Sequence, residues 1–480
     1  MAKKSPRTFS TSCFGLGLLC CVLSAQCSTP RPREHFASAT VRDAAASQAS
    51  DTEDSGLSAV PFDASLPRDA ARTDATAPDA TDAASLPRDA SADAAPPDAG
   101  GGDDVSAAME AAVLEACGEP PVSTESFSRK RLLEAGGRCA VYHYCAFRTA
   151  AEALERATDD YARDRSEPQL TAARAAFRAA MSRWSRAELF QFGPAASSSM
   201  SAGRDIYQGK GLRDRIYAWP TISRCRVEEQ LAEAMPNPSS ALISARGLFA
   251  LEYSLYFAGE GSECAASSRA AMVLGQLSAD DLREHKARYA SLVSADLRTQ
   301  SQALIDAWDP GAGNFISSFQ AAQGYPSEQE ALNVLGWALI YVEREMKDWK
   351  LGIPAGYTMT APVSLAETPY AGLGTEALRE NLRGFRALFQ GCGPQGEGIG
   401  FDDWLNDAGH GELSGLIVEE YEKSQRALDT LPPMPMATKE QLDAAYQTLR
   451  GLTNLLKGDL FGAGSPLGLK LPASVEGDTD

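Results

Sequence analysis

Apolar residues recur three and four positions apart along most of the chain beyond residue 107. In "EPQLTAARAAFRAAMSRWSRAELF" (167–190), Leu170, Phe177 and Trp184 fall on one face of a helix that begins beside a proline. The same spacing predicts further helices over 278–308, 327–352, 374–391, 414–431 and 438–461. No convincing alternation of apolar and polar residues, the pattern of a half-buried strand, interrupts them. The pattern therefore predicts an all-α fold.

Long helices with one apolar stripe bury that stripe by packing side by side, which produces helical bundles. At 480 residues the chain is long enough for more than one core. The stretch "DPGAGN…QGYPSEQ" (309–329) contains the glycines and the proline that are typical of a boundary. We therefore expect a first helical bundle over 107–310 and a second over 311–480.

The first 27 residues have the pattern of an export signal. Lys3, Lys4 and Arg7 give a positive start, and the apolar run "CFGLGLLCCVLSA" (13–25) is too short to be a permanent membrane span. The following "LSAQC" places Cys27 where a lipoprotein signal is cut and the cysteine acylated; ordinary secretory cleavage near residue 25 is the alternative. We expect an exported protein of the cell envelope that is attached to a membrane, on its periplasmic or outer face, through a lipid on Cys27.

Residues 28–106 have the composition of a disordered tether. Asp, Ala, Pro, Ser and Thr dominate, and "SLPRDA" occurs at 65–70 and again at 85–90. Between 41 and 104 there are 14 acidic and 4 basic residues, a net of −10 out of −19 for the chain. Such a segment buries too little apolar surface to offset the entropy of ordering it. The acidic balance also excludes nucleic acid as an expected partner.

Six cysteines remain when the signal segment and Cys27 are set aside: Cys117, Cys139, Cys145, Cys225, Cys264 and Cys392. An even number of cysteines in an exported protein predicts disulfides, although the sequence does not choose among the pairings. The stretch "CAVYHYC" (139–145) offers two cysteines and His143 as an alternative zinc site. Its spacing matches no common zinc pattern, and an oxidising compartment favours disulfides.

The stretch "GLFALEYSLY" (247–256) is helical by pattern, yet it carries an acid, Glu252, one turn after Phe249. Other stretches accompany it in a fixed order: "FQFGP" (190–194), "AWP" (218–220), "KLGIPAG" (350–356), "ETPYAG…LRENLRG" (367–384), "GIGFDDWL" (398–405) and the ending "EGDTD" (476–480). In their order and spacing these stretches resemble the imelysin family, whose members are also described as insulin-cleaving membrane protease-like or iron-regulated protein A-like. The resemblance covers most of 110–480.

The resemblance implies two helical bundles with a cleft between them. The family pattern at the helical stretch is Gly-x-His-x-x-Glu; here Gly247 and Glu252 match it, and Phe249 stands where the pattern has histidine. The residues we expect in the cleft are Gly247, Phe249, Glu252, Trp219, Glu367 and Tyr370. The family has been linked both to peptidase activity and to iron uptake.

Phe249 removes a metal ligand, because a phenyl ring has no lone pair to give. None of the remaining histidines beyond residue 107, which are His143, His285 and His410, stands out as a replacement, and His285 looks solvated among charges. Two alternatives remain open for Glu252. It binds a hard cation or iron together with Glu188, Asp214 and Glu367, or it pairs with an arginine such as Arg213, Arg215 or Arg246.

The favoured hypothesis is therefore a non-enzymatic, lipid-anchored envelope protein that binds a metal or a small molecule in iron or metal acquisition. No cofactor is certain; a divalent metal or iron at Glu252 is the candidate. The alternatives are a metal-dependent peptidase of the imelysin type and an interaction module with a vestigial cleft. Hydrolysis by serine or cysteine finds no support, because there is no Gly-x-Ser-x-Gly elbow and the cysteines look structural.

Overall fold

The computed structural model describes residues 102–196, 209–259, 261–357, 366–472 and 475. These residues are helical with irregular connections, and none of them forms a strand, so the predicted all-α fold is confirmed. No helix among them has both the length and the apolar character needed to cross a bilayer. The predictions for the signal segment, for Cys27 and for most of the tether lie outside the described residues.

The first half of the described chain is built on three long helices. Helix α2 (Arg129–Arg163) packs along both α3 (Glu167–Ala187) and α8 (Ala279–Trp308), while α1 (Gly102–Cys117) lies against α2. Helix α6 (Gly247–Tyr256) packs against α8 and α3. The predicted start of α8 at Ser278 is confirmed by a capping box, in which Ser278 and Asp281 bond each other's backbone amides.

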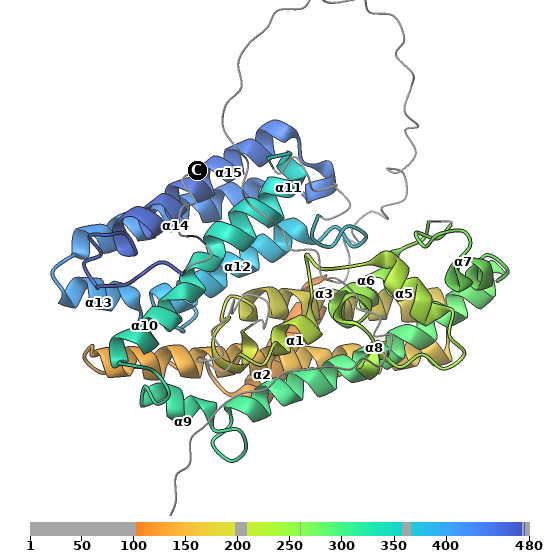
Figure 1. Ribbon diagram of the computed structural model, residues 1–480, viewed down its shortest axis with the longest axis horizontal. Helices are drawn as coiled ribbons and strands as arrows, with labels where there is room; N and C mark the ends of the chain where they lie inside the picture. The colour runs from red at the N-terminus through yellow and green to blue at the C-terminus, as the bar shows by residue number, and fades with distance from the viewer. Residues whose placement is uncertain (1–101, 197–208, 260, 358–365, 473–474, 476–480) are drawn as a thin grey trace, which may run out of the picture. The chain divides into compact units, whose positions relative to one another are not determined.

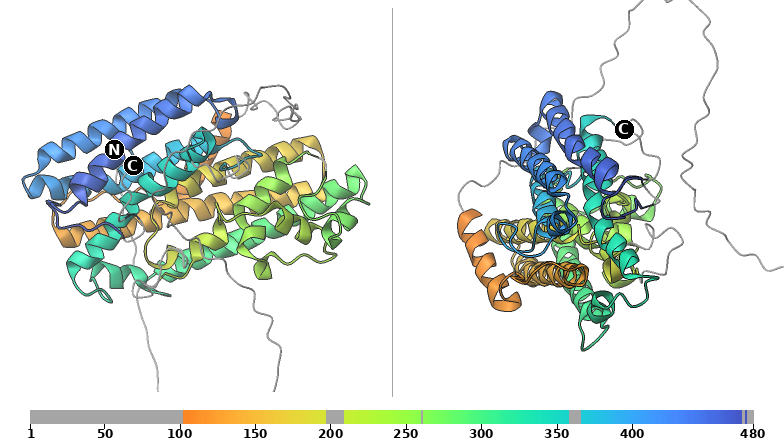
Figure 2. Two further views of the ribbon diagram at one scale, coloured as in Figure 1. Left: turned by 45° about the horizontal axis from the view of Figure 1, so that its top comes forward. Right: turned by 90° about the vertical axis from the view of Figure 1, so that its left-hand side faces the viewer.

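The second half forms another layer of helices. It contains α12 (Gly374–Phe389), α14 (Gly411–Thr430) and α15 (Lys439–Asn454), which lie above α2, α3 and α8 in Figure 1. The two layers stay side by side when the molecule is turned (Figure 2). They meet where α12 packs on α3. The predicted division into two bundles at residue 310 stays a prediction.

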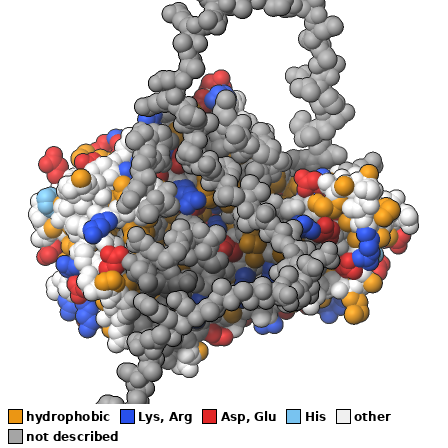
Figure 3. All heavy atoms as spheres, viewed as in Figure 1, with side chains coloured by type: hydrophobic (Ala, Val, Ile, Leu, Met, Phe, Trp, Pro, Cys, Tyr) orange, Lys and Arg blue, Asp and Glu red, His pale blue; other side chains and the backbone are white. Residues whose placement is uncertain are grey.

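Shorter elements connect these helices. The short α-helices are α4 (Leu212–Ile216), α5 (Arg224–Leu231), α7 (Arg269–Leu274), α9 (Phe315–Gln320), α10 (Glu328–Trp337), α11 (Gly352–Ala355) and α13 (Phe401–Asp407). The 3₁₀ turns are η1 (Gly193–Ala195), η3 (Pro238–Ser240), η4 (Ile243–Ala245), η5 (Ala338–Ile340) and η8 (Met434–Met436). On the side seen in Figure 3, the described surface carries acidic and basic side chains intermingled.

The helix predicted over 327–352 is not a single α-helix. It begins as α10, passes through the 3₁₀ turn η5 and continues as a π-helix, η6 (Val342–Leu351). The segment predicted over 438–461 likewise ends in a π-helix, η9 (Leu455–Leu460). In η6 the charged Glu343, Lys347 and Lys350 are buried, while Arg344 and Asp348 are partly exposed, so most of its charged residues lie inside the protein.

The six cysteines form three disulfides: Cys117–Cys145, Cys139–Cys392 and Cys225–Cys264. The expectation that these cysteines are structural is therefore met. The alternative zinc site at 139–145 is wrong, because Cys139 and Cys145 belong to different disulfides. His143 lies beside the second bond, with its Nε2 3.9 Å from Cys392 Sγ. Burial, with two nearby arginines, holds the pKa of His143 well below its usual value.

Candidate functional site

Helix α6 begins at a glycine that no other residue could replace without strain. Gly247 has φ +68°, and a Cβ atom there would lie 2.2 Å from the backbone oxygen of Ile216. The close approach fixes the start of α6 against the end of α4. All residues of α6 except the last are buried, so both Phe249 and Glu252 point into protein.

Glu252 is completely buried and is held by backbone amides. Its Oε1 accepts hydrogen bonds from the amides of Tyr370, at 2.8 Å, and Ala371, at 2.9 Å. Its Oε2 has no hydrogen-bond partner among the described residues. Burial raises the pKa of Glu252 to about 8; the two amides oppose this shift and the carboxylate of Glu367 adds to it. The side chain is therefore mainly a neutral acid at neutral pH.

The arginine partners expected for Glu252 are elsewhere. Arg246 pairs with Asp296, and Arg213 donates to the backbone oxygen of Trp219 and lies near Asp214. Arg215 is exposed. That expectation is therefore wrong, and its physical reason is the loop before α12, whose amide groups satisfy one carboxylate oxygen without a cation.

A buried ion cluster lies next to Glu252 where the two layers meet. The ammonium of Lys350, from η6, contacts the Glu188 carboxylate at the end of α3. It also lies 2.8 Å from Glu367 Oε1 and 2.9 Å from Asn381 Oδ1. We call Lys350, Glu188, Glu367 and Asn381 the Lys350 centre. All four side chains are buried, and Asn381 additionally donates to Glu188.

The Lys350 centre keeps its lysine charged. Burial alone would lower the pKa of Lys350, but the carboxylates of Glu188 and Glu367 outweigh burial and raise it. Lys350 Nζ also lies 5.5 Å from the ring centre of Tyr341 and 5.9 Å from that of Trp219. Aromatic faces at this distance add to the stabilisation of a cation. The ammonium thus has oxygen acceptors and aromatic faces around it.

Tyr217 connects the Lys350 centre with Glu252. Its side chain is buried, and its hydroxyl has no hydrogen-bond partner among the described residues. Burial raises the pKa of Tyr217 well above its usual value, and the carboxyl groups of Glu367, Glu252 and Glu188 add to that shift when they are ionised. Tyr217 therefore lies within electrostatic range of both Glu252 and the Lys350 centre.

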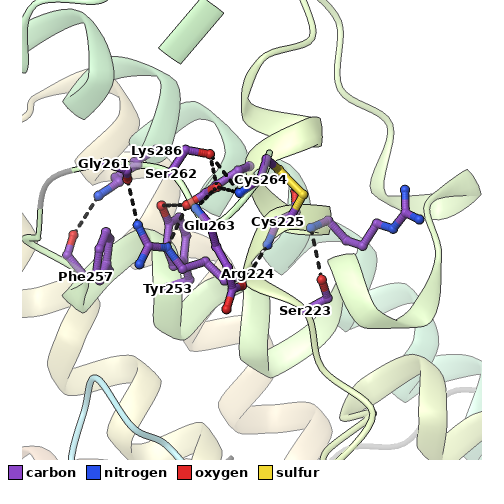
Figure 4. A network of polar contacts seen from close by, with 12 residues as sticks. Ser223, Arg224, Cys225, Tyr253, Phe257, Gly261, Ser262, Glu263, Cys264 and Lys286 are labelled. Carbon is purple, nitrogen blue, oxygen red and sulfur yellow. Dashed lines mark hydrogen bonds and ion pairs between the residues drawn. A yellow bond between two sulfur atoms is a disulfide. The ribbon is translucent and has the colours of Figure 1, made fainter. Parts of the chain in front are cut away.

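A second buried carboxylate, Glu228 of α5, has very different surroundings; Figure 4 labels its neighbours Arg224, Tyr253 and Ser262. It accepts hydrogen bonds from Arg224 Nε at 2.7 Å, Ser262 Oγ at 2.6 Å and Tyr253 Oη at 3.1 Å. The backbone amide of Glu263 adds a bond of 3.0 Å. The disulfide Cys225–Cys264 closes the same loop onto α5. This network is structural in character, because both oxygens of Glu228 have donors.

Comparisons with known proteins show the family and the fold of this chain. The model of the imelysin family, named as peptidase family M75, matches residues 140–456. The chain belongs to the imelysin family. The resemblance inferred from the sequence motifs is confirmed. No curated protein matches the chain significantly.

Two solved imelysin-like structures share the fold. A putative iron-regulated protein A precursor from Parabacteroides distasonis ATCC 8503 is 16% identical, with a TM-score of 0.52, over 71% of this chain and 96% of that one. An imelysin-like protein from Psychrobacter arcticum 273-4 is 15% identical, with a TM-score of 0.52, over 73% of this chain and 98% of that one. At such low identity the likeness shows the fold alone.

The cleft residues expected from the imelysin resemblance lie in one region. Tyr370 donates its amide to Glu252, and its ring centre is 6.3 Å from that of Phe249. Glu367 belongs to the Lys350 centre, and Trp219 faces its lysine. Sequence reasoning missed Lys350 and Asn381. One signal in the sequence could have found these two residues: they lie in the stretches 350–356 and 367–384, which carry the resemblance to the family.

The donor set around Glu252 does not fit a catalytic metal. Phe249 fills the position of the nitrogen ligand, and Glu188 and Glu367 already share the Lys350 ammonium. Asp214, the other candidate acid, lies 3.5 Å from Arg213. Among the described residues, the groups of three potential ligands that are close enough to share one ion are Cys139, His143 and Cys392, and Cys225, Glu229 and Cys264. Each group contains a disulfide, which leaves no thiolate to bind.

The other histidines do not replace the missing ligand. His410 is exposed just before α14. His285 is half-buried, with its Nδ1 2.8 Å from the backbone oxygen of Leu231, so the expectation that it is solvated is wrong. Its helix face turns toward the end of α5, which a helix pattern alone does not reveal.

Proposed function

We propose that this imelysin-family protein is an exported, lipid-anchored binding protein of the cell envelope that acts in metal or iron acquisition and does not cleave peptides. The observation that carries the non-catalytic part of the proposal is the Lys350 centre. A covalently attached ammonium contacts both carboxylates with which a bound metal ion would have to interact, and so competes with that ion. The signal pattern before Cys27 supports export, and the name of the solved iron-regulated relative supports the process.

A metallopeptidase needs a metal ion that lowers the pKa of a bound water, usually held by three protein ligands with one open position. In this chain Phe249 supplies no ligand. The pKa of Glu252, about 8, leaves that side chain mainly protonated at neutral pH, so a metal ion would have to displace its proton in order to bind there. The chemistry of these residues favours a binding role over catalysis.

Calorimetric titration of the full-length protein in detergent with Zn²⁺, Mn²⁺ and Fe²⁺ tests the proposal. We expect no submicromolar site in the unchanged protein. Phe249→His alone should raise the metal affinity only slightly, because Lys350 still contacts Glu188 and Glu367. Phe249→His combined with Lys350→Met should raise metal affinity by at least about tenfold, since it restores a nitrogen ligand and frees two carboxylates.

Phe249→His combined with Lys286→Met is the matched control, because Lys286 is another largely buried lysine outside the Lys350 centre. It should behave like Phe249→His alone. The melting temperature of each variant, with and without metal, shows whether it folds. A submicromolar metal site in the unchanged protein would overturn the proposal. Chelator-sensitive cleavage of insulin chains that Glu252→Gln abolishes would support the peptidase alternative, which the family name favours.

A further inference from the structure

A cavity of about 530 Å³ lies between α3, α12 and α14, and its lining includes four arginines. Arg183 and Arg186 come from α3, and Arg383 and Arg386 come from α12. In each helix the two arginines are three residues apart, so they share one helix face. We call these four residues and the cavity that they line the arginine groove. None of its lining residues belongs to the Lys350 centre.

A glycine brings the two arginine pairs together. A Cβ atom at Gly384 would lie 2.7 Å from the backbone oxygen of Arg186. Helices α12 and α3 therefore approach each other closely between the arginine pairs. The fold holds four guanidinium groups around one cavity, although like charges repel each other.

Acidic side chains pair with three of the four arginines of the arginine groove, and two of these three share one carboxylate. Arg186 and Arg383 share one carboxylate, that of Glu380. Arg183 pairs with Glu110, whose side chain is 61% exposed, and Arg386 donates to the backbone oxygen of Pro394. The remaining lining acid, Asp429, lies 3.8 Å from Arg379, which is outside the groove.

The four arginines keep unused hydrogen-bond donors. Each guanidinium carries five N–H donors. Within the described part of the chain, one nitrogen each of Arg183, Arg383 and Arg386, and two of Arg186, make hydrogen bonds. The side chains of Arg183, Arg186 and Arg383 are 10%, 25% and 45% exposed, so their remaining donors can be reached from solvent. A guanidinium with donors to spare can bind an oxyanion.

The neighbours of the arginine groove respond to its positive charge. Burial lowers the pKa of His143, and Arg186 and Arg183 lower it further. Burial raises the pKa of Tyr142, which also lines the groove; Arg183 and Arg186 oppose that shift, while Glu110 and Glu119 add to it. The positive charge of the arginines therefore acts on His143, whereas two acids offset it at Tyr142.

We propose that the arginine groove binds a small multivalent oxyanion, a polycarboxylate or a phosphate compound. Planar guanidinium groups bind carboxylate and phosphate oxygens in pairs, and the two arginine pairs offer such contacts from two adjacent helices, α3 and α12. The cavity volume lies within the usual range for small-molecule sites. This inference is independent of the proposed function, since it uses other residues and needs no metal.

Calorimetric titration of the full-length protein in detergent with citrate and with pyrophosphate, at low salt, tests this inference. We expect at least one of the two to bind, and added salt to weaken the binding. Acetate, with a single carboxylate, should bind more weakly by at least about tenfold. Failure of both citrate and pyrophosphate to bind would overturn the inference.

The variant for this test is Arg183→Gln with Arg386→Gln, because Arg186 and Arg383 are needed to pair with Glu380. It should weaken citrate or pyrophosphate binding by about tenfold or more. The control is Arg163→Gln with Arg226→Gln, two exposed arginines of α2 and α5, which should leave the affinity unchanged. An equal loss of affinity in both double variants would mean that the anion binds by general electrostatic attraction. That result would overturn the proposed site. Matching melting temperatures show that the variants fold.

Discussion

Glu228 and Glu252 are both completely buried glutamates, but their hydrogen-bond partners differ. Glu228 receives hydrogen bonds from Arg224, Tyr253, Ser262 and a backbone amide. One carboxyl oxygen of Glu252 accepts hydrogen bonds from two backbone amides. The other oxygen has no hydrogen-bond partner among the described residues. The comparison teaches that partners decide what a buried acid does. The first acid ties a loop to a helix, and the second is left available for protonation.

The largest expected effect is on the Glu228 network. Glu228→Ala removes the acceptor of every hydrogen bond that Glu228 receives in this network and leaves Arg224, whose side chain is 20% exposed, without its carboxylate. We expect the free energy of unfolding to fall by about 3–5 kcal/mol, since breaking one side of a buried ion pair strands its partner. Denaturant titration with the disulfides intact measures it.

The neighbouring Glu229 provides the control for that change. It pairs with Arg226 at the surface, with a side chain 41% exposed. Glu229→Ala should alter the free energy of unfolding by no more than about 1 kcal/mol. Similar losses in Glu228→Ala and Glu229→Ala would contradict the contrast between a buried network and a surface pair.

The next effect concerns Glu252 and depends on pH. Its pKa of about 8 in the folded protein lies above the value for an unfolded chain, 4.5. The stability that it contributes is therefore fully present at acidic pH and is lost as the pH rises toward 8. Glu252→Gln cannot lose a proton. The variant should match the unchanged protein near pH 4.5 and exceed its unfolding free energy by about 2–3 kcal/mol at neutral pH.

Unfolding measured in denaturant across this pH range checks the prediction for Glu252. Glu419→Gln, at a side chain that is 57% exposed, is the control and should follow the unchanged protein at every pH. A constant offset between Glu252→Gln and the unchanged protein would mean that Glu252 keeps an ordinary pKa, in which case its unpaired oxygen has a partner.

The smallest expected effect distinguishes charge from shape in the Glu228 network. The guanidinium carbon of Arg224 lies 4.0 Å from the ring centre of Phe257. Arg224→Lys keeps the positive charge but loses the flat stacking surface and the bond to the Gly261 carbonyl. We expect a loss of about 1 kcal/mol in the free energy of unfolding. A loss as large as that of Glu228→Ala would show that geometry outweighs charge here.

The long helices could be predicted from the sequence because each has a signal within its own residues. An apolar stripe marks α3, and a capping serine marks the start of α8 and of α10. The π-helix η6 could not be predicted, because its charged residues look like a solvated face. Their partners come from distant segments: Glu188 for Lys350, and Lys457 for Glu343.

The candidate site was predictable only in part for the same reason. Phe249 and Glu252 stand out because they are three residues apart in a short motif. The ion cluster beside them joins α3, η6 and α12, which are far apart in the chain and meet only in the folded protein. The amide groups that hold Glu252 were also invisible, since any residue in the loop at 370–371 supplies an N–H.

The disulfide Cys139–Cys392 closes a loop with a sequence separation of 253 residues, which includes most of the first layer and the whole junction between the layers. A protease that cuts anywhere inside that loop leaves both pieces covalently joined. In an environment rich in secreted proteases, a nicked molecule of this kind stays in one piece and keeps its helices in place until the bond is reduced.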